Sequence, residues 1–336
     1  MKAILLNRHA TIEEHPLEIC DIPRPNPCED EILIRISACG LCHTDLDEIE
    51  GRLEPAMMPV VPGHQVVGRV EQPATAAPRF EAGDRVGVTW LYSSCGTCEF
   101  CASGRENLCS AAKWTGKDAN GGYAEYMVVP EHFAHPLPSG LSDVQIAPLL
   151  CAGVIGYRTV RLANIENGQK IGLFGFGASA HIVIQVVRHL YPDSSVFVFT
   201  RSRSHQNLAL DLGAEWAGSP NQTPPARIHR AMDFTPVGQT VPLALGVLEK
   251  GGRLVINAIR KITPIPEFDY AARLWGEREI KSVANVTRAD AEQFLPLAAR
   301  IPIRPTVETF AFEAVNDALM KLKHSQVCGA AVLCVD

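Results

Sequence analysis

Four cysteines lie within fifteen residues of this chain, at Cys95, Cys98, Cys101 and Cys109. Four thiolates at such spacing can close a tetrahedral cage around one zinc ion and leave no open position for a reacting molecule. A ferredoxin-type cluster would need its fourth cysteine after three residues and then a proline, whereas seven residues intervene here and Ser110 follows. The spacing therefore predicts a structural zinc site.

Three further residues, widely separated in the sequence, could form a second metal site. Cys42, His64 and Cys151 offer two thiolates and an imidazole. This is the donor set of the catalytic zinc in alcohol dehydrogenases, where the fourth position stays open for water or substrate. We therefore expect two zinc ions per chain, one of them catalytic.

With both sites in place, the chain resembles the zinc-dependent medium-chain alcohol dehydrogenases over almost its whole length. Besides the ligands, the matching segments are Gly83-Asp-Arg-Val-Gly87, Gly122-Tyr-Ala-Glu-Tyr126, Cys151-Ala-Gly-Val, the glycine motif at 175–180 and Asn285-Val-Thr-Arg-Ala-Asp290. The resemblance implies an α/β fold in two parts. A GroES-like, β-rich catalytic domain (1–152 and 289–336) would hold both zinc sites, and a doubly wound Rossmann domain (153–288) would bind the dinucleotide.

The residue pattern also divides the chain into two regimes. Short β-branched runs between glycines and prolines predict strands at 1–6, 31–36, 66–70, 85–90 and 123–129. From about residue 165, strands and helices alternate, which predicts a doubly wound parallel sheet. Its strands are expected at 170–174, 195–200 and 253–258, and its helices at 178–189 and 206–212.

A glycine motif, Gly175-Phe-Gly-Ala-Ser-Ala180, lies between a predicted strand and a predicted helix. Gly175 permits the tight turn, and Gly177 lets the backbone approach a pyrophosphate at the helix N-terminus. Ala180 takes the third position, which the looser form of this fingerprint allows. The motif predicts binding of a nicotinamide dinucleotide.

The end of the second Rossmann strand bears on which cofactor is used. An NAD-binding protein usually carries an acid there for the ribose 2′-hydroxyl, but this sequence reads Thr200, Arg201, Ser202 and Arg203. Hydroxyl and guanidinium groups suit a 2′-phosphate, so NADP(H) is favoured over NAD(H). The alternative is a solvated helix start with a serine cap and exposed arginines. The resemblance adds Arg288 as a cofactor contact.

The resemblance also implies roles for the residues that follow Cys42. Thr44 would contact the oxygen of the substrate at the metal and pass its proton to the cofactor ribose, and His43 would lie near the cofactor phosphates. Asp45 would hold the second ring nitrogen of the ligand histidine. Asp47 stands where related enzymes often place a relay histidine, so proton exit is assigned to Asp47 or to water.

Three other positions would shape the metal and the substrate pocket. Gln65 follows His64 where a glutamate is usual, and loss of that charge should make the metal a stronger Lewis acid. By resemblance, Trp90 lines the substrate channel, where a bulky indole favours small primary alcohols and aldehydes. Trp114 would form a further wall.

Composition sets the remaining expectations. A length of 336 residues is a prior for two domains. A net charge of −6 without a basic run predicts neither a nucleic-acid nor a membrane partner. The sequence has no secretory or membrane-spanning segment, so a cytoplasmic location with reduced thiols is expected. Five cysteines outside the metal sites are expected to be buried or half-buried: Cys20, Cys28, Cys39, Cys328 and Cys334.

These inferences combine into a zinc enzyme that transfers a hydride between NADP(H), or NAD(H), and a small primary alcohol or aldehyde. The resemblance implies a homo-oligomer, a dimer or a tetramer. Two alternatives stay open: a zinc-free quinone or enoyl reductase of the same architecture, and a cofactor-binding protein without turnover.

Overall fold

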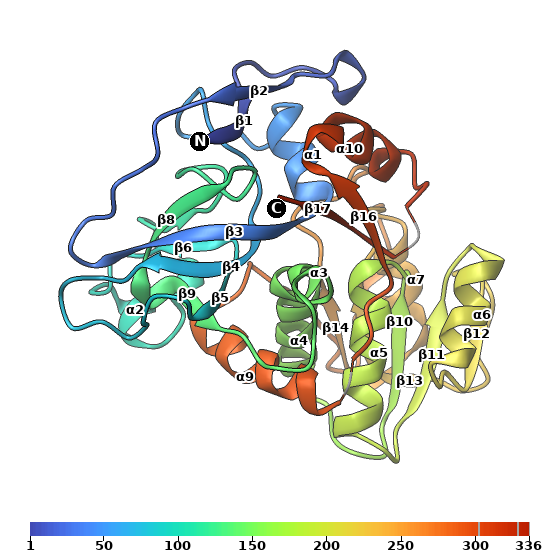
Figure 1. The fold of residues 1–336 in the computed structure, drawn as a ribbon. Helices are drawn as coiled ribbons and strands as arrows, with labels where there is room; N and C mark the ends of the chain where they lie inside the picture. Colours follow the sequence, from blue (N-terminus) through green and yellow to red (C-terminus); the bar gives the residue numbers. More distant parts are fainter. Residues whose placement is uncertain (302, 328, 336) are drawn as a thin grey trace. The chain divides into compact units, whose positions relative to one another are not determined.

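The computed structural model describes residues 1–301, 303–327 and 329–335, and the chain divides into two compact units (Figure 1). The first unit comprises Met1–Cys151, Val286–Ala299 and Arg304–Asp336. The second unit comprises Ala152–Asn285 with Arg300–Ile303. The carboxy-terminal part of the sequence therefore belongs mostly to the first unit.

The first unit is built on a seven-stranded sheet of order β16-β17-β3-β4-β5-β9, in which β8 also pairs with β3 (Figure 1). The strands are β3 (Glu31–Leu41), β4 (Gln65–Gln72), β5 (Arg85–Val88), β8 (Tyr126–Pro130), β9 (Ala134–Pro136), β16 (Val307–Ala311) and β17 (Ala330–Cys334). Strand β3 is buried along most of its length, and Ile32, Ile34 and Ile36 belong to the core of this unit. Strand β3 pairs with three other strands. Its carboxyl end is therefore held rigidly, and so are the residues that follow it.

Smaller elements complete the first unit. Strands β1 (Lys2–Leu6) and β2 (Leu17–Asp21) form one antiparallel pair, and β6 (Leu91–Ser93) and β7 (Lys113–Trp114) form another. The helices are α1 (His43–Ile49), α2 (Glu99–Ala102), α3 (Asp143–Ile146), α9 (Arg288–Arg300) and α10 (Val315–Lys323). Short 3₁₀ turns lie at η1 (Ile12–Glu14), η2 (Glu106–Leu108), η3 (Glu131–Phe133), η4 (Ala147–Leu150) and η5 (Phe312–Ala314).

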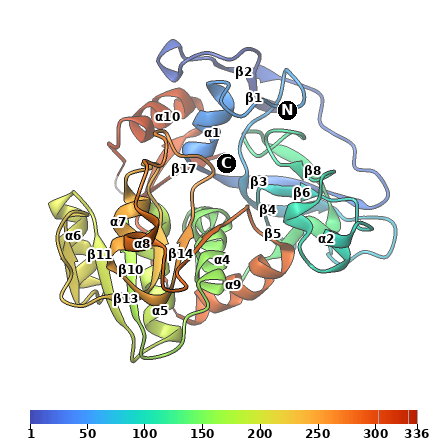
Figure 2. The same ribbon diagram turned by 180° about the vertical axis from the view of Figure 1, so that it is seen from behind.

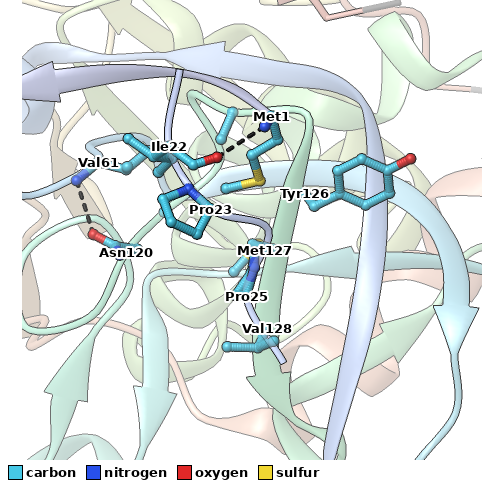
Figure 3. A pocket seen from close by; sticks show the side chains of 11 residues that line it. Met1, Ile22, Pro23, Pro25, Val61, Asn120, Tyr126, Met127 and Val128 are labelled. Carbon is cyan, nitrogen blue, oxygen red and sulfur yellow. Dashed lines mark hydrogen bonds between the residues drawn. The ribbon is translucent and has the colours of Figure 1, made fainter. Parts of the chain in front are cut away.

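A small cavity lies beside the β1–β2 pair (Figure 3). Its walls include Met1, Pro23 and Met127, and the amino group of Met1 donates to Ile22 O at 2.8 Å. Its volume is about 70 Å³, whereas pockets for small-molecule ligands usually exceed about 300 Å³. We therefore regard this cavity as a packing defect and not as a candidate site.

The second unit contains a six-stranded parallel sheet of order β12-β11-β10-β13-β14-β15. Numbered along the chain this is the order 3-2-1-4-5-6 of a dinucleotide-binding Rossmann sheet, which confirms the predicted doubly wound fold. The strands are β10 (Lys170–Phe174), β11 (Ser195–Phe199), β12 (Trp216–Gly218), β13 (Ile228–Asp233), β14 (Leu248–Ile256) and β15 (Glu279–Ser282). The order reverses between β10 and β13, and ligands of such sheets bind at that point.

Helices cover both faces of the Rossmann sheet. They are α4 (Ala152–Ala163), α5 (Ala178–Leu190), α6 (Arg203–Asp211), α7 (Thr240–Val247) and α8 (Tyr270–Arg273). One apolar cluster joins α4 and α5 to the sheet, and a separate cluster joins α7 to it. Figure 1 shows α4 and α5 in front of the strands, and Figure 2 shows α7 and α8 from behind.

Several predicted boundaries shift in the structure. Helix α6 begins at Arg203 and not at residue 206, because Ser202 caps it by accepting a hydrogen bond from His205 N at 3.4 Å. Strand β8 begins at Tyr126 and not at residue 123, because the amide of Tyr123 donates to Pro62 O in a loop. Strands β10 and β11 begin where predicted.

Two further expectations can be compared with the structure. Cys39 is buried and Cys20 and Cys334 are half-buried, but Cys28 is exposed, so the expectation was wrong for that residue. Cys28 precedes β3 in an irregular, proline-containing segment, whereas Cys328 lies outside the described residues. In the described chain no single helix is long and apolar enough to cross a membrane, although one bent pair of helices meets the length and composition criteria together.

Candidate active site

Helix α1 begins directly after β3, and its first turn positions the first predicted metal ligand. Cys42 is the N-cap of this helix, and its Sγ accepts a hydrogen bond from Thr44 N at 3.3 Å. The carboxylate of Asp45 in turn accepts a hydrogen bond from Cys42 N at 2.7 Å. This reciprocal capping box fixes the thiol and the carboxylate relative to each other.

The three predicted ligands of the catalytic metal come together in the first unit. The donor atoms of Cys42, His64 and Cys151 all lie within 4.8 Å of one another. Cys42 Sγ is 3.3 Å from His64 Nε2, and in a tetrahedral zinc site such a sulfur and nitrogen are separated by about 3.6 Å. The three donors therefore fit one zinc ion and leave one of its four positions open.

Hydrogen bonds and charges prepare these groups for a cation. His64 Nδ1 lies 3.0 Å from Asp45 Oδ1, and both side chains are fully buried, so the carboxylate orients the imidazole and leaves Nε2 toward the thiols. Burial alone would lower the pKa of His64, but the charges of Asp45 and Cys42 outweigh burial and raise it. A hydrogen bond from Cys151 lowers the pKa of the Cys42 thiol well below its usual range.

Glu48 is a residue of this site that the sequence analysis missed. It is fully buried on α1, three residues after Asp45, and the ligand atoms of Asp45, Glu48 and His64 lie within 4.8 Å of one another. Trp90 Nε1 donates to Glu48 Oε1 at 3.1 Å, and burial raises the pKa of Glu48 well above its usual range. The spacing i, i+3 from Asp45, which places both acids on one helix face, was the available signal.

Gln65 is buried beside the ligand His64. A Cβ atom on Gly40 would lie 2.8 Å from Gln65 Oε1, so the glutamine side chain packs closely on that glycine. Within the described structure, Gln65 Nε2 has no hydrogen-bond partner. Glu48 supplies a buried carboxylate near the same histidine, so residue 65 does not by itself set the charge around the metal position.

Trp90 stands next to the ligand His64, and Trp114 packs against Trp90. The ring of Trp90 lies 5.9 Å from that of His64 and 5.0 Å from that of Trp114, measured between centroids. Trp90 is half-buried and is held by its hydrogen bond to Glu48. The two indoles can therefore form one bulky wall beside the metal position.

The other predicted catalytic residues lie on the same helix with different surroundings. Thr44 is half-buried, and His43 is exposed. Asp47 is buried, and Arg52 Nε donates to its carboxylate at 2.5 Å. The proton-relay role of Asp47 stays a prediction, and it would have to operate through an ion-paired carboxylate.

The four-cysteine loop brings its thiols together around α2 and η2. The Sγ–Sγ distances are 3.5 Å for Cys95–Cys109, 3.6 Å for Cys98–Cys101 and 3.9 Å for Cys95–Cys101. Four sulfurs around one zinc ion are separated by about 3.8 Å, given zinc–sulfur bonds of about 2.3 Å. Amides of Thr97 and Cys98 lower the pKa of the Cys95 thiol to about 6. The loop thus fits a closed zinc site.

Arg288 lies against this loop in the first unit. Its backbone N and its Nε donate to Glu106 Oε1 at 2.9 and 3.3 Å, and its guanidinium lies 5.1 Å from the centroid of the Phe133 ring. Glu106 is buried. These contacts give Arg288 a structural task in addition to the predicted cofactor contact.

In the second unit, the glycine motif forms the turn between β10 and α5. Gly175 has φ +83°, and a Cβ atom there would lie 2.9 Å from Thr235 Cγ2, so both conformation and space require glycine. Gly177 is the N-cap of α5, and a Cβ atom there would meet no other atom within 4 Å. The backbone is therefore open to a phosphate at the helix N-terminus. Ala180 is fully buried.

The turn between β11 and α6 carries the residues predicted to select the cofactor. Thr200 is buried and Arg201 is exposed. Arg203 Nη1 donates to Gln206 Oε1 at 3.1 Å, and Ser202 is the N-cap of α6. The serine cap of the alternative interpretation is thus present, next to an exposed arginine.

Comparisons with known proteins agree with this geometry. A profile of the alcohol dehydrogenase GroES-like domain matches residues 28–139. A probable alcohol dehydrogenase of Mycobacterium tuberculosis is 43% identical over 340 residues, covering 100% of this chain and 97% of that protein. An alcohol dehydrogenase of Geobacillus stearothermophilus is 33% identical, with 99% of this chain and 98% of that protein covered. The solved structure of a cinnamyl alcohol dehydrogenase from Sorghum bicolor superposes with a TM-score of 0.88 at 27% identity, covering 99% of this chain and 96% of that one.

Proposed function

Because the chain belongs to the medium-chain alcohol dehydrogenase family, we propose that it interconverts small primary alcohols and aldehydes at a zinc ion bound by Cys42, His64 and Cys151. The observation that carries this proposal is the convergence of two thiols and one imidazole within 4.8 Å. A zinc-free quinone or enoyl reductase has no need of that donor set, so the geometry favours the zinc enzyme.

The residues around the donors support a division of tasks. A zinc ion held there would polarise an aldehyde oxygen or lower the pKa of an alcohol. Asp45 orients His64 through the 3.0 Å contact with Nδ1. Thr44, whose amide already contacts Cys42 Sγ, is the hydroxyl residue nearest in sequence to a ligand of this centre and is proposed to move the proton.

The second unit is proposed to hold the hydride carrier at the N-terminus of α5, where Gly177 leaves the backbone open. NADP(H) is proposed over NAD(H), because Arg201 is exposed at the end of β11 and no carboxylate occupies that turn. A nicotinamide cofactor supplies or accepts the hydride in such reactions.

A second zinc ion is proposed in the four-cysteine loop, whose sulfur spacing fits a closed tetrahedral site. Substrate size is proposed to be set by Trp90 and Trp114, because their indoles form a wall near His64. A bulky wall leaves room for short aliphatic chains and disfavours branched or aromatic ones.

The decisive experiment follows loss of reduced-nicotinamide absorbance with zinc-loaded protein and a panel of short aldehydes, with NADPH and NADH in parallel. Turnover that is faster with NADPH, at a content of two zinc ions per chain, is the expected result. Turnover with zinc absent would favour the zinc-free reductase. Two bound zinc ions without turnover would favour a cofactor-binding protein.

A further inference from the structure

Glu48 is a buried acid that forms no ion pair with a lysine or arginine of the described structure. Its Oε1 accepts one hydrogen bond, from Trp90 Nε1 at 3.1 Å. Its Oε2 is sealed from solvent and has no hydrogen-bond partner in the described part of the chain. Neighbouring Asp45 adds a second buried acid on the same helix face.

Glu50, two residues after Glu48, is an acid whose negative charge is compensated by cationic side chains. Lys323 Nζ donates to Glu50 Oε1 at 2.7 Å, and Arg52 forms an ion pair with the other oxygen. Within the described residues, no lysine or arginine pairs with Glu48 in this way. The two acids therefore differ in charge compensation although they lie on the same helix end.

Ionising an acid such as Glu48 without a nearby cation is costly, because burial removes the water that would solvate its charge. An apolar side chain of similar volume would pack the same space without that cost. A cation bound near this position would offset that cost. Glu48 lies close to the cluster of Cys42, His64 and Cys151 through the shared His64, since a carboxylate oxygen of Glu48 and a ring nitrogen of His64 are within 4.8 Å of each other.

We propose that Glu48 helps to hold the metal at the Cys42–His64–Cys151 cluster, as an additional anionic group that raises the affinity of the centre for a divalent cation. This inference rests on the proposed zinc centre. Gln65, the buried neighbour of His64, is a neutral amide and cannot supply this charge. Because Oε2 is sealed from solvent, Glu48 acts on the metal and not as a group that exchanges protons with bulk water.

The test measures how long the protein keeps its zinc. Wild-type protein and Glu48→Gln are loaded with zinc and challenged with a chromophoric chelator, and the zinc released is counted against time. Glu48→Gln is expected to lose one zinc ion about 10–100-fold faster, the range found when groups that support metal ligands are replaced. Retention of the zinc ion in the four-cysteine loop serves as the internal control that the variant is folded.

Two control variants separate charge from packing. Glu50→Gln makes the same chemical change at an acid that is already ion-paired, and its zinc release should match the wild type. Trp90→Phe removes the hydrogen bond to Glu48 but keeps the carboxylate, and it should also retain zinc.

Equal release from Glu48→Gln and wild type would overturn the inference and leave the proposed enzyme intact. Release from Trp90→Phe as fast as from Glu48→Gln would also overturn it, because the effect would then arise from packing. A wild-type protein that holds zinc only in the four-cysteine loop would overturn both the inference and the proposed catalytic centre.

Discussion

At the scale of single residues, neighbouring acids on α1 have different partners and therefore different consequences. Asp45 contacts the ligand His64, Asp47 is paired with Arg52, and Glu48 accepts a hydrogen bond from the indole of Trp90. All three acids are buried. All three side chains are carboxylic acids, so what distinguishes them is the group that each one contacts.

Arg201 is predicted to select the phosphorylated cofactor. In Arg201→Asp, a charge-assisted contact to the 2′-phosphate is replaced by repulsion, so the KM for NADPH should rise about 10–100-fold. The KM for NADH should stay the same or fall. Initial rates with each cofactor measure both, and Arg8→Asp, a reversal of charge at an exposed arginine of the first unit, is the control. An unchanged preference for NADPH in Arg201→Asp would contradict the prediction that this turn selects the phosphorylated cofactor.

Trp90 is predicted to limit substrate size. Trp90→Ala should raise kcat/KM for bulky aldehydes about tenfold, because a removed wall admits groups that the pocket previously rejected. Short aldehydes should react more slowly for lack of contacts. Rates over an aldehyde series of increasing length and branching test this, and Trp90→Phe, which keeps an aromatic wall, should stay near wild type. A uniform fall across the series would argue against a role in selectivity.

At the scale of elements, strand β9 places a titratable group inside the first unit. His135 is buried on β9, where it pairs with Gly87 of β5. Burial, with smaller effects of the charges on Arg79 and Arg288, lowers the pKa of His135 to about 4. The folded strand therefore contains a neutral imidazole down to distinctly acidic pH.

This neutral histidine predicts a pH dependence of stability. The unfolded chain binds the proton below about pH 6.5 but the folded chain does so only below about pH 4, so stability falls as pH falls through that window. Between pH 7.5 and 5 the loss attributed to His135 is about 2 kcal/mol. In His135→Gln this contribution should vanish, as measured by urea unfolding at the two pH values. The same change at exposed His132 should leave the pH dependence intact, and equal slopes for all three proteins would refute the prediction.

At the scale of the whole molecule, the Rossmann sheet ends in an uncovered strand. All four residues of β15 are exposed, and β14 is its only partner within the described sheet. Large apolar side chains are exposed on β15 and on the segment before it, at Ile280, Trp275 and Tyr270. An edge with free backbone groups and apolar side chains suits pairing with a second copy of the chain.

We therefore predict a homodimer that uses β15. Ile280→Lys places a charge on that edge and should shift the protein toward monomer, as measured by light scattering coupled to size exclusion over a dilution series. Ile19→Lys, a change at an equally exposed isoleucine of the first unit, should leave the oligomeric state unchanged. A wild-type protein that is monomeric at all concentrations would contradict the prediction.

Much of the local structure and the class of chemistry could be predicted from the residues alone. The strand from Lys170 and the glycine turn at Gly175 follow from residue type and spacing, because periodicity and turn conformation are local properties. The two sets of metal ligands could also be named from the sequence. The four-cysteine loop follows from its spacing, and the other three ligands follow from the segments that match the family. The resemblance then predicted membership of the alcohol dehydrogenase family, and a relative that covers the whole chain supports that membership.

Tertiary structure alone decided how buried charges are balanced. Glu48 and Glu50 look alike in sequence, yet the cation that pairs with Glu50 comes from Lys323, far along the chain. The contact of Arg288 with Glu106 spans 182 positions and likewise has no local signal. Burial and charge pairing depend on which distant segments pack together, and the free energy of a buried charge depends on those partners. For that reason the metal-supporting role proposed for Glu48 depends on the fold, which shows which of the described acids are ion-paired.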